Sequence, residues 1–177
     1  MLRIEVQRPL QVAFGRFRGG EPIPVAAGTV VYVGSAMAAK GASSLARRLV
    51  RHATRSAGQP AHPIRVHLLR ELPRRGLGQG DLRPRAGKRL FWNVDYLLDQ
   101  PAASLTHVVA IRSSVRLEAA LARLLQRDPA TFVLAPGLGA ADDPGSTHLL
   151  EVEGGDTWWA ALLPRLEGLV SARQLPD

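Results

Sequence analysis

A strand, a tight turn and a helix follow one another between residues 29 and 56, and this unit constrains the fold more than any other part of the chain. The β-branched and aromatic run TVVYV at residues 29–33 predicts a strand, and Gly34 ends it in a turn. Ser43 or Ser44 can cap a helix that runs to about Ser56. Apolar residues form one arc of this helix and arginines the other, so it packs by one face and offers the other to anions.

The rest of the chain carries short strands and helices in mixed order. Leu2–Val6 predicts a strand that pairs with residues 29–33 in an opening hairpin. Further elements are expected as strands at 106–111 and 148–152, helices at 114–127 and from Asp156 onward, a helix or strand at 90–99, and a loop at 136–146. This mixture predicts an α+β fold built as one layer pair.

The chain has 177 residues, enough for one well-packed core. We expect a main domain over residues 1–155 and a C-terminal helical extension over 156–177. Residues 58–89 are rich in proline, glycine and arginine. This composition predicts a basic insertion that is partly mobile.

Positive charge is concentrated in residues 47–90. This stretch holds twelve Arg and Lys and two acidic residues, a net +10, whereas the whole chain carries +8. Such clustering is the electrostatic footprint of a protein that binds phosphate backbones. A genome rich in arginine codons explains Arg in place of Lys but not the clustering. The basic side chains expected to contact nucleic acid are Arg47, Arg51, Arg55, Arg74, Arg75, Arg83, Arg85, Lys88 and Arg89.

Composition also limits location and partners. The absence of cysteine excludes a disulfide-linked partner, Cys-ligated zinc and a thiol nucleophile, so a metal would be bound by oxygen or imidazole. No apolar run is long enough for a bilayer, and the first residues lack the pattern of a signal peptide. We therefore expect a cytoplasmic protein that does not bind membranes.

The first candidate site combines Tyr32, Gly34, Arg48 and His52. Arg48 and His52 are four residues apart and share a helix face, so the unit can bring a phenol, a bare backbone turn and two cationic groups around one phosphate. Arg48 could hold a phosphodiester, and Tyr32 could act as a general base or orient one. The alternative is an ordinary half-buried strand tyrosine beside a solvated face of arginines.

Glu118 is the second candidate, because the periodicity of residues 114–127 places it within the apolar arc of a helix. A carboxylate there is costly unless it is paired or bound to a metal, and Mg²⁺ needs only one or two carboxylates. An ion pair with an arginine from elsewhere is the alternative. A third cluster lies in FWNVDY at residues 91–96. Its aromatic rings could stack on bases, but core packing is favoured for Trp92, and Asp95 could orient Arg48 or His52.

These residues resemble the GIY-YIG nuclease superfamily, in particular its small stand-alone Uri-type branch. GTVVYVGSA at residues 28–36, followed by Arg48 and His52, resembles the second half of that signature. FWNVDYL, RLEAALA with Glu118, and GLGAADD followed by His148 and Leu149 resemble later motifs in the same order. The similarity spans residues 2–152.

The resemblance implies an α+β fold with a central three-stranded antiparallel sheet flanked by helices. It also implies an endonuclease that hydrolyses phosphodiester bonds with one Mg²⁺ or Mn²⁺ held by Glu118. Tyr32, Arg48 and His52 would complete the catalytic site, and Gly34 and Ser35 would lie against the nucleic acid. The sequence departs from the pattern in four places. The opening strand has no counterpart of the first signature tyrosine, and Val30 stands where the branch usually has another tyrosine. Phe91 and Asn93 replace two histidines, and Ala140, Ala141 and Asp143 replace two serines and a cysteine.

Three functions follow as hypotheses. The first is a metal-dependent endonuclease acting on nucleic acid, with DNA favoured over RNA. The second is a catalytically reduced nucleic-acid-binding protein with the same fold. The third is a structural domain whose basic segment binds another acidic partner.

Overall fold

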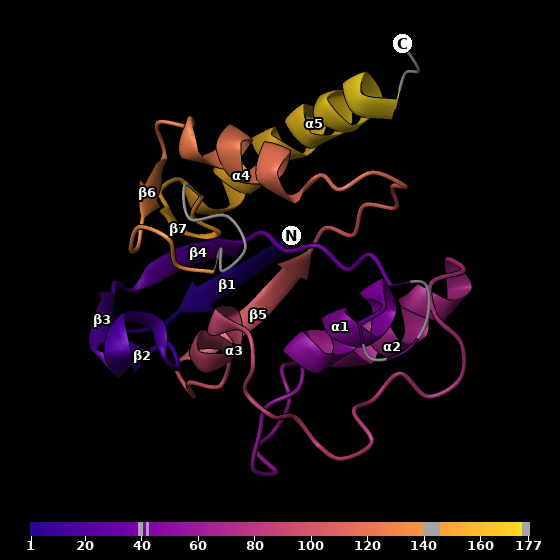
Figure 1. Cartoon of the computed structure of the whole chain (residues 1–177), viewed down its shortest axis with the longest axis horizontal. Coiled ribbons are helices and arrows are strands. Elements are labelled where there is room, and N and C mark those ends of the chain that lie inside the picture. The colour runs from indigo at the N-terminus through magenta and orange to yellow at the C-terminus, as the bar shows by residue number, and fades with distance from the viewer. Residues whose placement is uncertain (39–40, 42, 140–145, 175–177) are drawn as a thin grey trace.

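The computed structural model describes residues 1–38, 41, 43–139 and 146–174 (Figure 1). The elements are β1 (Leu2–Val6), β2 (Leu10–Ala13), a 3-10 turn (Phe17–Gly20), β3 (Pro22–Val25), β4 (Gly28–Tyr32), α1 (Leu45–His52), α2 (Ile64–Arg74), α3 (Asn93–Leu98), β5 (Ala103–Val108), α4 (Glu118–Gln126), β6 (Thr131–Val133), β7 (Leu149–Val152) and α5 (Gly155–Gln174). This order confirms the α+β class.

The main sheet is antiparallel, with five strands in the order β5-β1-β4-β7-β6, and β2 and β3 form a separate ribbon. It is thus wider than the three strands that the resemblance implied, because β5 and β6 add to its two edges. Leu2 lies opposite Tyr32, which confirms the predicted pairing of the first strand with residues 29–33. On the other side of β4, Tyr32 lies opposite Leu149 of β7. The predicted strand at 106–111 begins and ends earlier, because β5 pairs with β1 and that pairing ends where Val108 meets Leu2.

Helices cover both faces of the main sheet, and β4 shows why. Val30 and Tyr32 pack into a core with α1, α2 and α3. Val31 and Val33 point to the opposite face and pack with α4 and α5. Figure 1 shows α4 and α5 on one side of the sheet and α1 to α3 on the other. The predicted single layer pair is therefore wrong: a strand that is apolar on both faces needs cover on both, and the sheet is the middle of three layers.

Two helix boundaries differ from the prediction. Helix α1 begins after Ser44 as expected but ends at His52 rather than Ser56, because the carboxylate of Asp99 accepts hydrogen bonds from the backbone and hydroxyl of Ser56 at 2.8 and 2.5 Å. Helix α4 begins at Glu118 rather than at residue 114. The Ser113 hydroxyl bonds locally to both backbone groups of Val115, which offers that segment an alternative to helix.

The basic segment 58–89 contains α2, whose Leu68 and Leu72 are buried in the core that α1 also joins. Leu82, farther along, is buried there as well. The segment is thus tied to the domain at three apolar side chains. The predicted C-terminal extension is tied in the same way, since α5 buries Trp158, Trp159, Leu162 and Leu166 in the core on the other face.

Within the described residues, no helix is both long and apolar enough to cross a membrane. The predicted loop at 136–146 includes residues 140–145, which lie outside the described part of the chain.

His62 joins α3 to β5 in the interior. Its Nε2 lies 3.0 Å from the carbonyl oxygen of Leu98, and the backbone N–H of Leu105 donates to its Nδ1 at 3.1 Å. One nitrogen therefore donates and the other accepts, so the ring is neutral. Burial lowers the pKa of His62 to about 4, and the charges of Arg55 and Lys88 act in the same direction.

We expect the free energy of unfolding to fall as the pH is lowered from about 6.5 toward about 4. The unfolded chain takes up a proton on His62 near its ordinary pKa of 6.5, whereas the folded protein does so only near pH 4, so the stabilisation is lost on acidification. The loss from this group is at most about 3 kcal/mol. Urea unfolding followed by tryptophan fluorescence at a series of pH values measures it.

The matched control is His62→Gln, which keeps polar atoms at the position but removes the titration. Buried His52, whose pKa is also lowered to about 4, contributes with the same sign in both proteins. The variant should therefore show a shallower fall than the wild type. Identical slopes for the two proteins would contradict the assignment to His62.

Candidate active site

Tyr32, Gly34 and Arg48 meet where β4 ends. Nη2 of Arg48 donates to the Tyr32 hydroxyl at 3.1 Å, and Nη1 of Arg48 donates to the carbonyl oxygen of Ser35. A Cβ at position 34 would lie 2.7 Å from the Tyr32 hydroxyl oxygen, so the phenol can occupy this place only over a glycine. The strand, turn and helix thus bring together the residues that the sequence singled out.

The Tyr32 phenol is buried, and this burial raises its pKa above the ordinary value of 10. The positive charge of Arg48 lowers the pKa but offsets only part of the effect. Tyr32 is therefore a neutral phenol at neutral pH. Of the two roles predicted for it, orienting a reacting group fits this environment better than acting as an ionised base.

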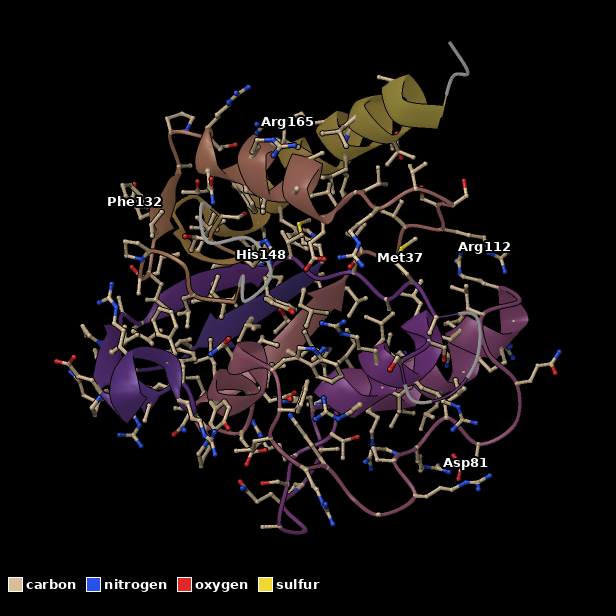
Figure 2. The ribbon with its side chains drawn as sticks, in the orientation of Figure 1. Met37, Asp81, Arg112, Phe132, His148 and Arg165 are labelled. Atoms are coloured by element: carbon tan, nitrogen blue, oxygen red, sulfur yellow. The ribbon has the colours of Figure 1, made fainter. Side chains whose placement is uncertain are left out.

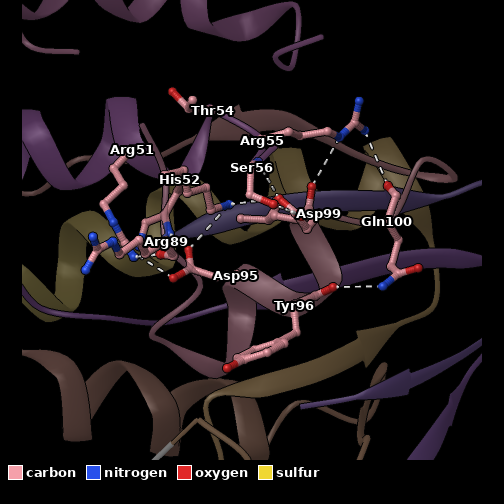
Figure 3. A network of polar contacts seen from close by, with 12 residues as sticks. Arg51, His52, Thr54, Arg55, Ser56, Arg89, Asp95, Tyr96, Asp99 and Gln100 are labelled. Carbon is pink, nitrogen blue, oxygen red and sulfur yellow. Dashed lines mark hydrogen bonds and ion pairs between the residues drawn. The ribbon is translucent and has the colours of Figure 1, made fainter. Parts of the chain in front are cut away.

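His52 and Asp95 form a buried pair (Figure 3). Nδ1 of His52 lies 3.0 Å from Oδ1 of Asp95, and burial lowers the pKa of His52 to about 4. The ring is thus neutral, with its hydrogen on Nδ1 facing the carboxylate. Its edge lies against Tyr32, with ring centroids 6.0 Å apart. His52 therefore positions the tyrosine, and Asp95 positions His52.

Asp95 also organises the start of α3. Its Oδ2 accepts hydrogen bonds from the backbone N–H groups of Phe91 and Trp92, both at 3.0 Å, as an N3 residue does in a capping box. Arg51 and Lys88 lie 3.0 and 3.5 Å from the same carboxylate. Burial alone would raise the pKa of Asp95, but His52 and the two cations outweigh it and hold the pKa well below its ordinary range.

Trp92 links this network to Arg48. The guanidinium carbons of Arg48 and Arg51 lie 4.2 and 4.3 Å from the centre of its indole ring, which is cation–π distance. Sequence reasoning favoured core packing for Trp92, and the side chain is only partly buried. Its position holds the two arginines of α1 side by side.

Glu118 approaches the same place from the other side of the sheet. It is the first residue of α4, where the helix dipole favours a negative charge, and its side chain is 16% exposed. The Ser35 hydroxyl donates to Oε2 of Glu118, and Nδ1 of His148 lies 3.3 Å from Oε1. Figure 2 shows His148 between the sheet and α4. Burial alone would raise the pKa of Glu118, but the contacts with His148 and Ser35 outweigh it and lower the pKa to about 2.

The residues around Glu118 fit a largely hydrated divalent cation. The carboxylate is ionised at neutral pH, the Ser35 hydroxyl adds a second oxygen, and a cavity of about 70 Å³ adjoins both. No group of three histidine or carboxylate ligands occurs among the residues that the structure describes. One carboxylate with water is the arrangement that Mg²⁺ accepts, so Glu118 would hold Mg²⁺ or Mn²⁺ without a protein cage.

The basic residues predicted to contact nucleic acid divide into two groups. Arg74, Arg75, Arg83, Arg85 and Arg89 are exposed, and Arg47 and Arg51 are partly exposed. Lys88 is fully buried between Asp95 and Asp99, and Arg55 donates to the carbonyl oxygens of residues 60, 98, 100 and 103. In this structure these last two side chains hold the fold together, so neither is placed to meet a phosphate.

Four arginines line one cavity beside α1. Arg47, Arg51, Arg83 and Arg85, together with Leu82 and Pro84, enclose about 400 Å³. No carboxylate belongs to this lining in the described part of the chain. Arg51 of this lining and Arg48 of the site at Tyr32 both lie against the Trp92 ring, so one aromatic side chain contacts a residue of each.

The sequence did not single out His148 as a site residue. It lies immediately before β7, and β7 pairs with β4 so that Leu149 is opposite Tyr32. The available signal was a histidine at the start of the expected strand 148–152, in a segment that resembles a family motif, but the strand order was needed to place it beside Tyr32. Among the described residues, its Nε2 has no hydrogen-bond partner.

Searches of curated proteins and of solved structures each gave no significant match to this chain. One family model matches residues 1–169, nearly the whole chain, and it is described as a domain of unknown function, DUF123. The main sheet, helices α1 to α4, most of α5 and every site residue above lie within this range. The chain therefore belongs to the DUF123 family.

Proposed function

We propose that this chain is a metal-dependent endonuclease with a GIY-YIG-like fold that hydrolyses phosphodiester bonds of nucleic acid, DNA in the first place. The observation that supports the proposal best is an unbroken chain of contacts from Tyr32 through Arg48 and Ser35 to Glu118. These residues come from a strand, two helices and a turn. A structural tyrosine beside a solvated arginine face would not need a partly buried, ionised carboxylate in contact with the same turn.

Arg48 is the phosphate clamp in this proposal. Two of the N–H groups of its guanidinium are used by Tyr32 and Ser35, and a guanidinium has five, so donors remain for phosphate oxygens. Trp92 and the two hydrogen bonds hold the side chain in place before substrate arrives. Preorganised donors of this kind stabilise the charge that develops on the phosphate during attack.

Tyr32 and Glu118 act on either side of that clamp. The neutral Tyr32 hydroxyl accepts from Arg48 and keeps its own hydrogen to orient a water molecule or a phosphate oxygen. Glu118 would hold Mg²⁺ or Mn²⁺, which would supply charge stabilisation at the phosphate and a more acidic water. Hydrolysis adds one water across the bond and leaves one phosphate end and one hydroxyl end.

Nicking of supercoiled plasmid tests the proposal. Wild-type protein should convert the plasmid to open-circular form in Mg²⁺ or Mn²⁺ and should leave it intact in EDTA. Single-stranded DNA and RNA of the same sequence should be assayed beside it. Absence of cleavage on all substrates with both metals would rule out the enzyme.

A second candidate function is nucleic-acid binding without cleavage, and the arginine-lined cavity favours it independently of the catalytic residues. Arg47 and Arg85 make no ion pair or hydrogen bond with other described residues, so both are available to phosphates. Nucleic-acid binding therefore requires only this basic surface. Cleavage requires Tyr32, Arg48 and Glu118 as well.

We expect duplex DNA to bind with a steep dependence on salt, because each contacted phosphate releases counterions. The logarithm of the binding constant should fall against the logarithm of salt by about 0.9 for each phosphate. Replacing Arg83 and Arg85 together by alanine should make the slope shallower by about 1 to 2. Fluorescence anisotropy in EDTA, over a range of salt concentrations, measures both slopes.

The matched control replaces Arg123 and Arg127, two exposed arginines toward the other end of α4 from Glu118. This variant loses the same charge and should keep the wild-type slope. A flat salt response of the wild type would favour the third hypothesis, a domain that binds another acidic partner. Equal slopes for the two double variants would mean that the cavity is not the contact surface.

A further inference from the structure

Phe91 is the most exposed large apolar side chain among the described residues, at 76%. It lies two residues before the start of α3, and its backbone N–H donates to the Asp95 carboxylate at 3.0 Å. Its ring meets the Trp92 ring edge to face, with centroids 5.1 Å apart. An aromatic ring held from behind and open in front offers a flat apolar face on which another ring can stack.

A cavity of about 630 Å³ opens beside Phe91. Its lining includes Arg16, Phe17, Asn93 and Tyr96, which combine aromatic faces, polar groups and a cation. The side chain of Asn93 already donates to the carbonyl oxygen of Phe14 at 3.0 Å, so its oxygen is the group left to accept. The volume lies in the range of sites that hold small organic molecules, and no carboxylate belongs to the lining in the described part of the chain.

Charge around the ring identifies the occupant. Exposed Arg16 lines the same cavity as Phe91, and exposed Arg89 lies two residues before Phe91 in the chain. Arg51 donates to the Arg89 carbonyl oxygen and lies over Trp92. An aromatic platform among arginines fits a flat aromatic group on an anionic chain, which is what a nucleotide is. A base can stack on a protein ring only when it is not stacked between its neighbours inside a duplex. The base that stacks on Phe91 is therefore expected to be unpaired.

We infer that Phe91 is a stacking platform for an unpaired base, and that this protein selects single-stranded nucleic acid or an unpaired nucleotide beside the bond it acts on. The inference rests on the proposed function for its substrate class. Trp92 is the link between the platform and the catalytic residues, since it touches both Phe91 and Arg48. A base held on Phe91 would fix the strand that Arg48 clamps.

The test measures binding in EDTA, where cleavage cannot interfere. The probe is a single-stranded DNA of about 12 nucleotides with one 2-aminopurine, a fluorescent base that is quenched when it stacks, and the control probe is the same strand in a duplex. Phe91→Ala should weaken single-strand binding by about fivefold to a hundredfold and reduce the quenching, while duplex affinity changes by less than about twofold. Phe91→Trp should keep both.

Val66→Ala is the matched control, because Val66 is 68% exposed on α2 and belongs to no cavity described here. Unchanged single-strand binding by Phe91→Ala, an equal loss on both probes, or no binding by the wild type would overturn the inference. Plasmid nicking judges the proposed function separately. Quenching that depends on Phe91, without any cleavage, would support base stacking on Phe91 and rule out the nuclease. Cleavage by a wild type whose single-strand binding does not depend on Phe91 would support the nuclease and rule out base stacking on Phe91.

Discussion

Glu118→Gln should lower the rate of plasmid nicking in Mg²⁺ by about a hundredfold to a thousandfold. Glutamine has the same size and can still accept the hydrogen bond from Ser35, so the turn and α4 keep their places. What is lost is the negative charge that would hold the divalent cation. The initial rate of conversion of supercoiled to open-circular plasmid measures the effect, with binding in EDTA as the check that substrate affinity is unchanged.

Glu153→Gln is the control for that experiment. Glu153 is an exposed carboxylate directly after β7, so its substitution removes the same charge away from the turn at Ser35. It should cleave at the wild-type rate. If Glu118→Gln also cleaves within about twofold of the wild type, Glu118 is not the metal ligand and the site assignment is wrong.

Asp95→Ala should reduce the free energy of unfolding by about 3 to 5 kcal/mol. The carboxylate is 0% exposed and compensates Arg51 and Lys88, the second of which is itself completely buried. Removing it leaves the buried Lys88 ammonium without its nearer carboxylate. It also leaves the backbone N–H groups of Phe91 and Trp92, just before α3, without their acceptor. Since domains of this kind are stable by only about 5 to 15 kcal/mol, urea unfolding should show a large shift of the midpoint.

Asp81→Ala is the matched control, because Asp81 is an exposed acid on the same basic segment that bonds locally to Arg83. It should unfold like the wild type. The contribution of Asp95 to the free energy of unfolding also depends on pH. Because the pKa of Asp95 is lowered in the folded protein, this contribution is complete above the unfolded pKa of about 4 and is lost only in stronger acid. Equal midpoints for the two variants at pH 7 would contradict this account of Asp95.

Local rules were enough to predict part of the candidate site. A β-branched run, a glycine and a capped helix determined that Tyr32, Gly34 and Arg48 would meet, because each step spans only a few residues. The four-residue spacing of Arg48 and His52 likewise placed both beside Tyr32. The same reasoning gave the pairing of β1 with β4, whose alternation and turn signals lie in the sequence itself.

Long-range contacts account for what local reasoning missed. Glu118 was predicted to be a site residue because its carboxylate would lie on the apolar face inside a helix. In the structure it is the first residue of α4, and it is partly buried against Ser35 and His148 instead. Lys88 was predicted to be a surface cation, but its side chain is buried beside two carboxylates, Asp95 in α3 and Asp99 directly after it. In both cases the deciding partner is more than six residues away in sequence and becomes visible only once strand and helix order are known.

Tyr32 belongs to the core on one face of the sheet, and Arg48 lies on α1, which packs into that core. Glu118 begins α4, which packs into the core on the other face. The distance between the Arg48 guanidinium and the Glu118 carboxylate therefore depends on how both cores pack against β4. A substitution that changes the volume of a core side chain under α4 or α5 should move Glu118 relative to Arg48, although the substituted residue contacts neither of them.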